Sequence, residues 1–300
     1  MSSVAIVIPA FKADFLDRTL RSIAGQTCRD FTVYVGDDAS PENLEVIVTP
    51  FGKDMPVVYR RFAENLGSSD LVRSWERVLD LVEEDWIWLF SDDDIMPEDG
   101  VGRLLDAVKA NPGRDFFRFP LSLIDGDDSI TRKGPELEPG ITSAQTLLTD
   151  YFRGKSDSAA CEYAFSKSLF QRLRMVHFPA AWCADVATWF SYASSAKGVV
   201  NIPGKPVLWR NVEGVNISST AGLHQVKMQA LIGFVVWLRA HWDGKADKYF
   251  CSSLRHYLET NLRISFRGEY TNADLLSLCK AFAGFSRFRA LKIYLKYRKR

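Results

Sequence analysis

The chain has 300 residues, of which 47% are hydrophobic and 25% charged, which is ordinary for a soluble globular protein and enough for a sizeable core. Its formal net charge of +1 excludes the broad basic character that would point to nucleic acid. The five cysteines are scattered and include no Cys-x-x-Cys pair. This excludes the usual zinc-ribbon and redox motifs and favours reduced thiols in a cytosol.

The first 120 residues alternate between segments with a strand pattern and segments with a helix pattern. Strand-length runs of β-branched and aromatic residues predict strands at 4–10, 31–37, 56–62, 86–90 and 116–120. Helical spacing of apolar residues predicts helices at 15–26, 41–51, 68–84 and 97–112. Ser40-Pro41 and Met96-Pro97 are typical of a residue before a helix, followed by proline at its first position. This alternation predicts right-handed βαβ units and a parallel sheet.

The second half begins with a segment that is typical of loops and hairpins. It then predicts a helix at 142–153, a strand leading into a short helix at 159–170, a helix at 182–195, and strands at 199–202 and 205–210. Residues 211–222 are polar and contain Gly214 and Gly222, which suits either a mobile lid or an ordinary linker. Further helices are predicted at 223–242, 246–265, 271–284 and 286–298.

Acidic clusters follow two of the predicted strands. Asp37 and Asp38 end the second strand, and Asp92, Asp93 and Asp94 end the fourth. Ligands bind at the carboxyl ends of the strands in such sheets. Two like charges about 4 Å apart repel by roughly 4 kcal/mol at an effective dielectric near 20, which a divalent cation would relieve. The alternative is that these aspartates are solvated residues of turns and helix caps. For Asp37-Asp38, a ligand site and a turn are equally good interpretations.

These segments together resemble a known family. "VAIVIPAFKADFLDRTLRSIAGQT", "FTVYVGDDAS", "ENLG" and "WLFSDDDIMP" are similar, in order and spacing, to the family 2 glycosyltransferases. The resemblance is good over residues 4 to about 110 and weaker through Asp185 and "VNISS" at 215–219. It implies an α/β protein of GT-A fold, a Rossmann-like, mostly parallel nucleotide-diphospho-sugar transferase sheet flanked by helices, with a C-terminal helical extension. The implied domains are 1–220, with a nucleotide-sugar half at about 1–120 and an acceptor half at about 121–220, and a helical region at 221–300 with a basic tail.

The resemblance implies transfer of a sugar from a nucleotide diphosphate sugar to a hydroxyl, with inversion and with Mg²⁺ or Mn²⁺. The nucleotide-sugar site would include Pro9, Phe11, Asp37, Asp38, Asn65, Gly67, Asp92 and Asp93. In that site Asp38 would hold the base, and Asp92–Asp94 would form the Asp-x-Asp region that carries ribose and metal. The family pattern is usually Asp-x-Asp-Asp, and Ser91 stands at its first position here.

Two registers of this acidic region remain open. If the segment stays extended, Asp92 and Asp94 share a face, because side chains at i and i+2 point the same way. If the family register holds, Asp93 and Asp94 act together. We favour Asp92 at the ribose, with Asp93 and Asp94 as the candidate metal ligands.

Asp185 is the candidate catalytic base, because the family places an acidic residue at the start of a helix here. Without the resemblance, a helix N-terminal acid favoured by the dipole would be preferred. Arg210 could bind the diphosphate bidentately or be a plain surface arginine. Trp182 could stack on a sugar or pack, whereas Trp189 is expected in the core. His177 and His224 are expected to be surface or packing residues.

Two other function classes compete with glycosyl transfer. A nucleotidyl- or phosphotransferase could also use an Asp cluster with Mg²⁺, although P-loop and dinucleotide motifs are missing from the sequence. A non-catalytic nucleotide-binding module is the second alternative, because Ser91 replaces an acid. The resemblance favours bacterial polysaccharide biosynthesis, of O-antigen or capsule type.

The expected location is cytoplasmic, with peripheral attachment to the inner face of the plasma membrane as an option. The N-terminus lacks a basic segment, and the apolar run at 230–238 is half the roughly 18–20 residues that a spanning helix needs. Residues 287–300 hold seven Lys/Arg and no Asp/Glu. On a helix, Arg289, Lys292, Lys296 and Arg300 would form a basic face beside Phe288, Leu291 and Leu295. That pattern predicts binding to an anionic membrane carrying a lipid-linked acceptor; the alternative is a helix packed on the protein by Phe288 and Leu291.

Overall fold

The computed structural model describes residues 3–212 and 222–299. The stretch at 211–222 that suits a lid lies mostly outside these ranges. The "VNISS" residues at 215–219 and the predicted domain boundary at residue 220 also lie outside the described residues.

The N-terminal half alternates strands and helices as the sequence predicts. Its elements are β1 (Val4–Ala10), α1 (Leu16–Ala24), β2 (Phe31–Asp37), α2 (Leu44–Val48), the 3-10 turn η1 (Thr49–Lys53), β3 (Val57–Arg61), α3 (Leu71–Leu79), β4 (Trp86–Leu89), α4 (Gly100–Ala110) and β5 (Phe116–Arg118). Strands β1 and β4 are buried almost throughout, which explains their continuous apolar sequences.

Two of the expected helix starts are wrong, since α2 and α4 begin at Leu44 and Gly100 rather than at the prolines. The Ser40 hydroxyl accepts the Glu42 N–H at 3.1 Å and donates to Phe11 O at 2.6 Å, so it holds a loop against the end of β1. Short-range bonds of serine to neighbouring backbone compete with helix formation in this way.

The second half adds antiparallel strands and a small second sheet. Its elements are β6 (Leu121–Ile124), β7 (Ile130–Arg132), β8 (Gly140–Thr142), α5 (Ala144–Phe152), η2 (Ala160–Glu162), β9 (Tyr163–Ser166), α6 (Lys167–Leu173), η3 (Pro179–Ala181), α7 (Ala184–Ser195), β10 (Val199–Asn201) and β11 (Val207–Arg210).

The main sheet has eight strands in the order β3-β2-β1-β4-β9-β5-β10-β8. Strands β3, β2, β1 and β4 are parallel neighbours, whereas β9 runs antiparallel between β4 and β5. Strands β11, β6 and β7 form a separate three-stranded sheet. The main sheet is therefore mostly parallel and flanked by helices, which confirms the predicted fold class.

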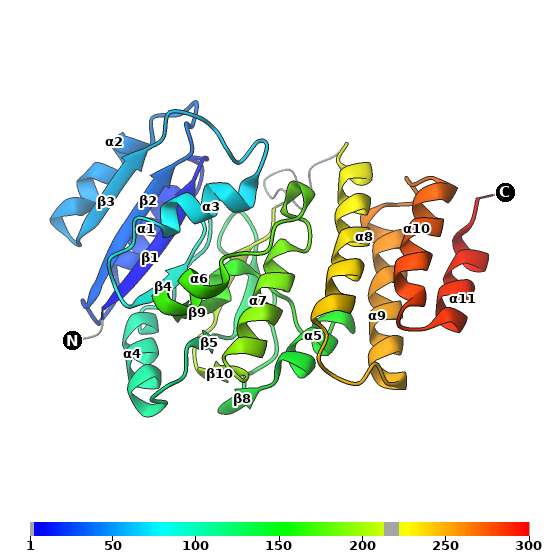
Figure 1. The fold of residues 1–300 in the computed structure, drawn as a ribbon. Coiled ribbons are helices and arrows are strands. Elements are labelled where there is room, and N and C mark those ends of the chain that lie inside the picture. The colour runs from blue at the N-terminus through cyan, green and yellow to red at the C-terminus, as the bar shows by residue number, and fades with distance from the viewer. Residues whose placement is uncertain (1–2, 213–221, 300) are drawn as a thin grey trace.

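Four helices form the C-terminal region, as predicted. They are α8 (His224–His241), α9 (Lys248–Thr260) with its π-helical end η5 (Asn261–Ser265), α10 (Asn272–Ala283) and α11 (Arg287–Tyr297). In Figure 1 they stand side by side at the end of the molecule away from β3, with α11 outermost.

One hydrophobic core joins this helical region to the sheet. The core contains Phe152 of α5, Trp189 of α7, Phe234 of α8 and Leu254 of α9, all nearly inaccessible to solvent. Phe152 also stacks on Tyr257 of α9 with ring centroids 4.9 Å apart. Helix α9 is thus fixed beside α5, where it can form one wall of a site at the sheet edge.

A membrane-spanning helix is not found in residues 3–212 or 222–299, because no helix there is both long and apolar enough.

Candidate active site

A cavity of about 930 Å³ opens at the carboxyl ends of β1 and β4. Its other walls come from the end of α5, the turn between η3 and α7, and α9 with its π-helical end. This is the edge at which ligands bind in open α/β sheets. The volume is at the upper end of the roughly 300–1,000 Å³ typical of ligand pockets.

Most of the predicted site residues line this cavity. They are Pro9, Phe11, Asp38, Asn65, Gly67, Asp92, Asp93 and Asp185. Asp37, Asp94 and Arg210 are not brought to the cavity wall. The Asp37 carboxylate binds the Tyr59 hydroxyl and Arg61, each at 2.6 Å, so it fastens the end of β2 to β3.

Asp38 shapes the loop that follows β3. Its two carboxylate oxygens accept the backbone N–H groups of Leu66 at 3.0 Å and Gly67 at 2.7 Å, and it also pairs with Arg77. A Cβ at position 67 would lie 2.6 Å from the Asp38 carboxylate, so this close approach needs glycine. Asp38 therefore presents the loop with Asn65 and Gly67 to the cavity.

Asp92 ties the end of β4 to the end of β1. One oxygen of its carboxylate accepts the backbone N–H groups of Phe11 at 2.9 Å and Lys12 at 3.0 Å. Burial still raises the pKa of the Asp92 carboxyl above its ordinary value, although these two hydrogen bonds oppose the shift. The bonds hold the two strand ends together at the floor of the cavity.

Asp93 presents its carboxylate to the cavity without a hydrogen-bond partner among residues 3–212 and 222–299. Burial, together with the neighbouring charges of Asp94 and Asp92, raises the pKa of this carboxyl well above its ordinary value. A carboxylate that is buried beside like charges is strongly stabilised by a nearby cation. The described residues contain no group of three or more His, Cys, Asp or Glu side chains arranged to hold a metal ion.

Asp94 turns away from the cavity and supports Arg210. It is fully buried, and its carboxylate accepts the Arg210 backbone N–H at 2.8 Å. The Arg210 guanidinium is buried too, where it donates to Asp93 O at 2.8 Å, pairs with Asp128, and lies 4.1 Å from the centre of the Phe15 ring. The surface-arginine alternative is wrong, and these contacts connect β11 to the end of β4.

Asp185 reaches the cavity from an unusual turn. Ala180, Ala181 and Cys183 all have left-handed backbones, with φ of 54°, 52° and 67°. This conformation costs roughly 1–2 kcal/mol for each non-glycine residue. Asp185 follows in the first turn of α7, and burial raises the pKa of its carboxyl to about 6. A strained turn that delivers a carboxyl with a raised pKa to a cavity is typical of a functional site.

Comparisons with known proteins place part of the chain in a known family. Residues 5–147 match the sequence model of the family described as Glycosyl transferase family 2. This match supports a family 2 glycosyltransferase domain in residues 5–147. The resemblance drawn from the sequence motifs is therefore confirmed for this part of the chain.

Relatives of this glycosyltransferase domain are distant in sequence. An uncharacterised glycosyltransferase of Haemophilus influenzae is 24% identical over 147 residues, which are 48% of this chain and 48% of that protein. The chain thus spans about half the length of this curated relative.

Two solved glycosyltransferase structures show the same fold. S. aureus TarS 1–349, crystallised in complex with UDP-GlcNAc, has a TM-score of 0.72 at 12% identity, covering 97% of this chain and 89% of that one. The mannosyltransferase PcManGT from Pyrobaculum calidifontis, in complex with GDP-Man and Mn²⁺, has a TM-score of 0.50 at 19% identity, covering 99% and 81%.

Sequence reasoning missed one wall of the cavity. His256, Thr260, Asn261 and Ser265 line it from α9 and its π-helical end, although the C-terminal helices were expected only to extend the fold. Polar residues at positions 256, 260 and 261 share a helix face, and that face would have been the available signal. Tyr151 and Asp157, at and after the end of α5, were also missed.

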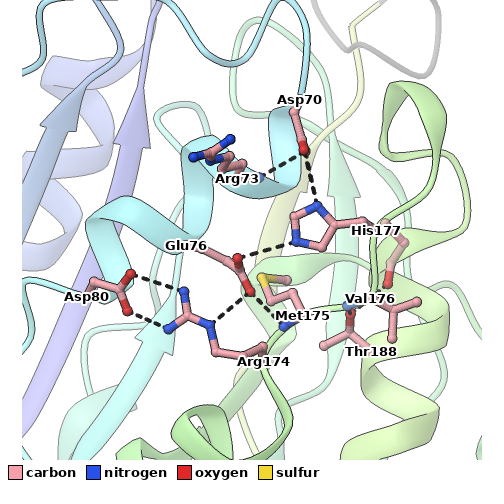
Figure 2. Close-up of polar contacts among 10 residues, drawn as sticks. Asp70, Arg73, Glu76, Asp80, Arg174, Met175, Val176, His177 and Thr188 are labelled. Atoms are coloured by element: carbon pink, nitrogen blue, oxygen red, sulfur yellow. Dashed lines mark hydrogen bonds and ion pairs between the residues drawn. The ribbon is translucent and has the colours of Figure 1, made fainter.

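A polar network fixes the approach to the Asp185 turn (Figure 2). The Glu76 carboxylate of α3 accepts the Met175 backbone N–H at 2.9 Å and also contacts Arg174 and His177, each at 3.3 Å. The second nitrogen of His177 lies 3.3 Å from the Asp70 carboxylate. His177 is thus a structural link, in keeping with its expected packing or surface role.

The two tryptophans near Asp185 differ in environment. Trp182 is half-buried and lines the cavity. Trp189 is 1% exposed and packs among Phe116, Tyr163 and Phe165, which confirms its expected place in the core.

Proposed function

We propose that this protein transfers a sugar from a nucleotide diphosphate sugar to a hydroxyl group of a glycan or lipid-linked glycan, with inversion at the anomeric carbon. The observation that carries the proposal is that Asp92, Asp93 and Asp185 line one cavity, although they come from distant parts of the sequence. The strand-end carboxylates suit the donor, and the carboxyl on the α7 turn suits the acceptor.

The nucleotide would bind against the ends of β1 and β4. In this proposal Pro9, Phe11, Asp38, Asn65 and Gly67 surround the nucleoside, and Asp92 accepts a ribose hydroxyl with its second oxygen. Because Asp92 already holds the Phe11 and Lys12 backbone, binding would need little rearrangement of this floor. Arg210 would act indirectly, through the Asp93 backbone that it holds.

Asp185 would accept the proton of the acceptor hydroxyl as that oxygen attacks the anomeric carbon. A base whose pKa is about 6 is mostly ionised at neutral pH yet retains proton affinity. Attack from the side opposite the departing diphosphate forms the new C–O bond as the old one breaks, which inverts the anomeric configuration. The proton stays on Asp185 until solvent removes it.

A divalent cation, Mg²⁺ or Mn²⁺, fits the residues present. Asp93 offers a carboxylate that lacks a hydrogen-bond partner in the described ranges, and burial and the charges of Asp94 and Asp92 outweigh the opposing charges of Arg210 and Lys12. Proteins often hold Mg²⁺ by one or two carboxylates, with phosphate oxygens and water completing the shell. Such a cation would supply Lewis-acid neutralisation of the departing diphosphate. Asp93 is our candidate ligand, and Asp94 remains a candidate only with a different orientation.

The structural neighbours support a donor of this class. TarS was crystallised with UDP-GlcNAc, and PcManGT is in complex with GDP-Man and Mn²⁺. Both are nucleotide diphosphate sugars. We further propose that the acceptor is lipid-linked and that α11 contacts an anionic membrane, since Phe288, Leu291 and Leu295 are more than half exposed among basic residues.

A product assay tests the proposal. Purified protein should release nucleoside diphosphate from a donor only in step with glycosylation of an acceptor. A thermal-shift screen of nucleoside diphosphates with Mn²⁺ identifies the donor first, because a ligand at about 100 times its dissociation constant stabilises a protein by about 2.7 kcal/mol. Binding without turnover of any donor would reduce the protein to a nucleotide-binding module.

A further inference from the structure

The α9 wall of the cavity contains an unused hydrogen-bond acceptor. Asn261 is 3% exposed and lines the cavity at the start of the π-helical turn. Its Nδ2 donates to Tyr257 O at 3.0 Å, but its Oδ1 forms no hydrogen bond within the described residues. A buried polar atom without a partner is costly unless a ligand satisfies it, and π-helical turns are frequent at functional sites.

The same region contains an unused donor. Trp182 lines the cavity three residues before Asp185, and its indole Nε1 is buried without a hydrogen-bond partner in the described parts of the chain. The Cys183 Sγ lies 3.3 Å from the Tyr257 hydroxyl, which joins this turn to α9. The donor on Trp182 and the acceptor on Asn261 are therefore held by elements in direct contact.

The unpartnered acceptor in this region suits a hydroxyl group better than an anion. Of the described residues that line the cavity, the one Lys or Arg is Lys12, which lies at the donor end beside Asp92. The region near α9 instead contains the carboxyls of Asp157 and Asp185. Asp157 is paired with Arg132, and the Lys227 ammonium lies 5.0 Å from the centre of the Trp182 ring. An ionised phosphate or carboxylate has no proton to donate to Asn261 Oδ1, whereas an uncharged hydroxyl meets both an acceptor and a donor.

We propose that Trp182, Asn261 and the polar face of α9 form the acceptor subsite, and that it takes the terminal sugar of an uncharged glycan. One sugar hydroxyl would donate to Asn261 Oδ1, and another would accept from Trp182 Nε1. Sugar rings also pack well on an indole. This assignment rests on the proposed function, because it places the acceptor beside Asp185.

The test measures glycan binding directly and uses matched variants. Saturation-transfer NMR titrations of the full chain, with UDP or GDP present, compare methyl glucoside, methyl galactoside and methyl N-acetylglucosaminide with the anionic probes glycerol 3-phosphate and ribitol 5-phosphate. Trp182→Phe keeps the aromatic ring and removes the N–H. Trp242→Phe is its control, because Trp242 Nε1 is also buried without a partner but lies outside the cavity.

The neutral glycosides should bind and the phosphates should not. Trp182→Phe should weaken the neutral glycosides by about three- to tenfold, the loss expected for one hydrogen bond, while Trp242→Phe should not. Asn261→Leu should weaken them similarly, with Asn272→Leu on the exposed start of α10 as its control. Nucleotide affinity should stay unchanged in all four variants.

Three results would contradict the proposed subsite. The phosphates could bind more tightly than the neutral glycosides, or no neutral probe could bind. The third is wild-type affinity in both Trp182→Phe and Asn261→Leu. Failure of the proposed function would differ, because the wild-type protein would then bind neither UDP nor GDP.

Discussion

The Glu76 carboxylate in α3 accepts the backbone N–H of Met175 at 2.9 Å, although the two residues are 99 positions apart. The same carboxylate contacts Arg174 and His177 (Figure 2). This contact joins the donor side of the fold to the segment that leads into the left-handed turn before Asp185. The position of Asp185 thus depends on a residue that does not itself line the cavity.

Glu76→Gln should lower both stability and turnover. The amide retains one acceptor but loses the charge that holds Arg174 and His177, so we expect the free energy of unfolding to fall by about 1–3 kcal/mol. The kcat should fall by a larger factor than the KM for the donor changes. The reason is that Asp185 moves, whereas the ends of β1 and β4, which are proposed to bind the nucleotide, keep their positions. Chemical denaturation and steady-state kinetics measure these effects. Glu45→Gln on the exposed face of α2 is the control, and equal behaviour of the two variants would exclude the positioning role.

Asp93→Asn and Asp94→Asn should differ in their response to metal. Asp93→Asn should abolish the gain in nucleoside diphosphate affinity that Mn²⁺ provides, while leaving the binding of the bare nucleoside unchanged. Asp94→Asn should mainly lower stability, because Asp94 holds the Arg210 backbone in the core. Calorimetric titrations with and without Mn²⁺ separate the two cases. Unchanged metal dependence in both variants would remove the carboxylate cluster from the metal site.

Activity should fall on acidification through the pKa of Asp185, which is about 6. Below that pH the folded protein holds a proton on Asp185, and a protonated carboxyl cannot act as a base. The profile of kcat/KM at saturating Mn²⁺ should therefore show an acid limb near pH 6. A flat profile between about pH 5 and pH 8 would contradict the assignment of the base.

The raised pKa of Asp185 has the opposite effect on stability, because the folded protein loses stability as the pH rises. Because the folded state binds the proton more tightly than the unfolded state, the contribution of Asp185 to stability is largest below about pH 4. It is lost as the pH rises through about 6. Asp185→Asn should thus be more stable than wild type at pH 7.5, by about 1–3 kcal/mol, in thermal or urea unfolding. A less stable variant would mean that the ionised carboxylate has stabilising partners.

The exposed apolar stripe on α11 should bind anionic vesicles. Phe288, Leu291 and Leu295 are 66%, 54% and 54% exposed, whereas Ala290 and Ile293 are buried. The alternative of packing through Phe288 and Leu291 is therefore wrong; the helix packs through its other face. Replacing Leu291 and Leu295 together by Ser should reduce sedimentation with phosphatidylglycerol vesicles, and salt should weaken the wild-type interaction. Val46→Ser on α2 is the control, and equal sedimentation of all three proteins would exclude membrane binding by α11.

Much of the fold could be predicted from the sequence because its signals are local. The apolar runs of β1 and β4 and the spacing in α1 and α3 are properties of single segments, so their periodicity identifies them. The insertion of β9 between β4 and β5 could not be predicted, because it depends on pairing with strands far along the chain. The starts of α2 and α4 were misplaced because loop contacts decide them.

The candidate site divides in the same way. Asp92 and Asp93 follow a buried strand directly, so their place at the sheet edge follows from the sequence pattern. Whether Asp94 and Arg210 face the cavity or the core depends on β11, which arrives more than 100 residues later. The contribution of Asn261 depends on how α9 packs against α5, and the polar face of its own segment does not specify which element α9 packs against.

The most direct test of this account is the turnover of Asp185→Asn, measured as nucleoside diphosphate release in the presence of acceptor. The near-isosteric change keeps the packing of α7 and removes the proton acceptor, so donor affinity should remain that of the wild-type protein. The account predicts a fall in kcat of at least about a hundredfold, in line with the loss of a general base. Turnover close to that of the wild type would contradict it, because the base would then have to be another group.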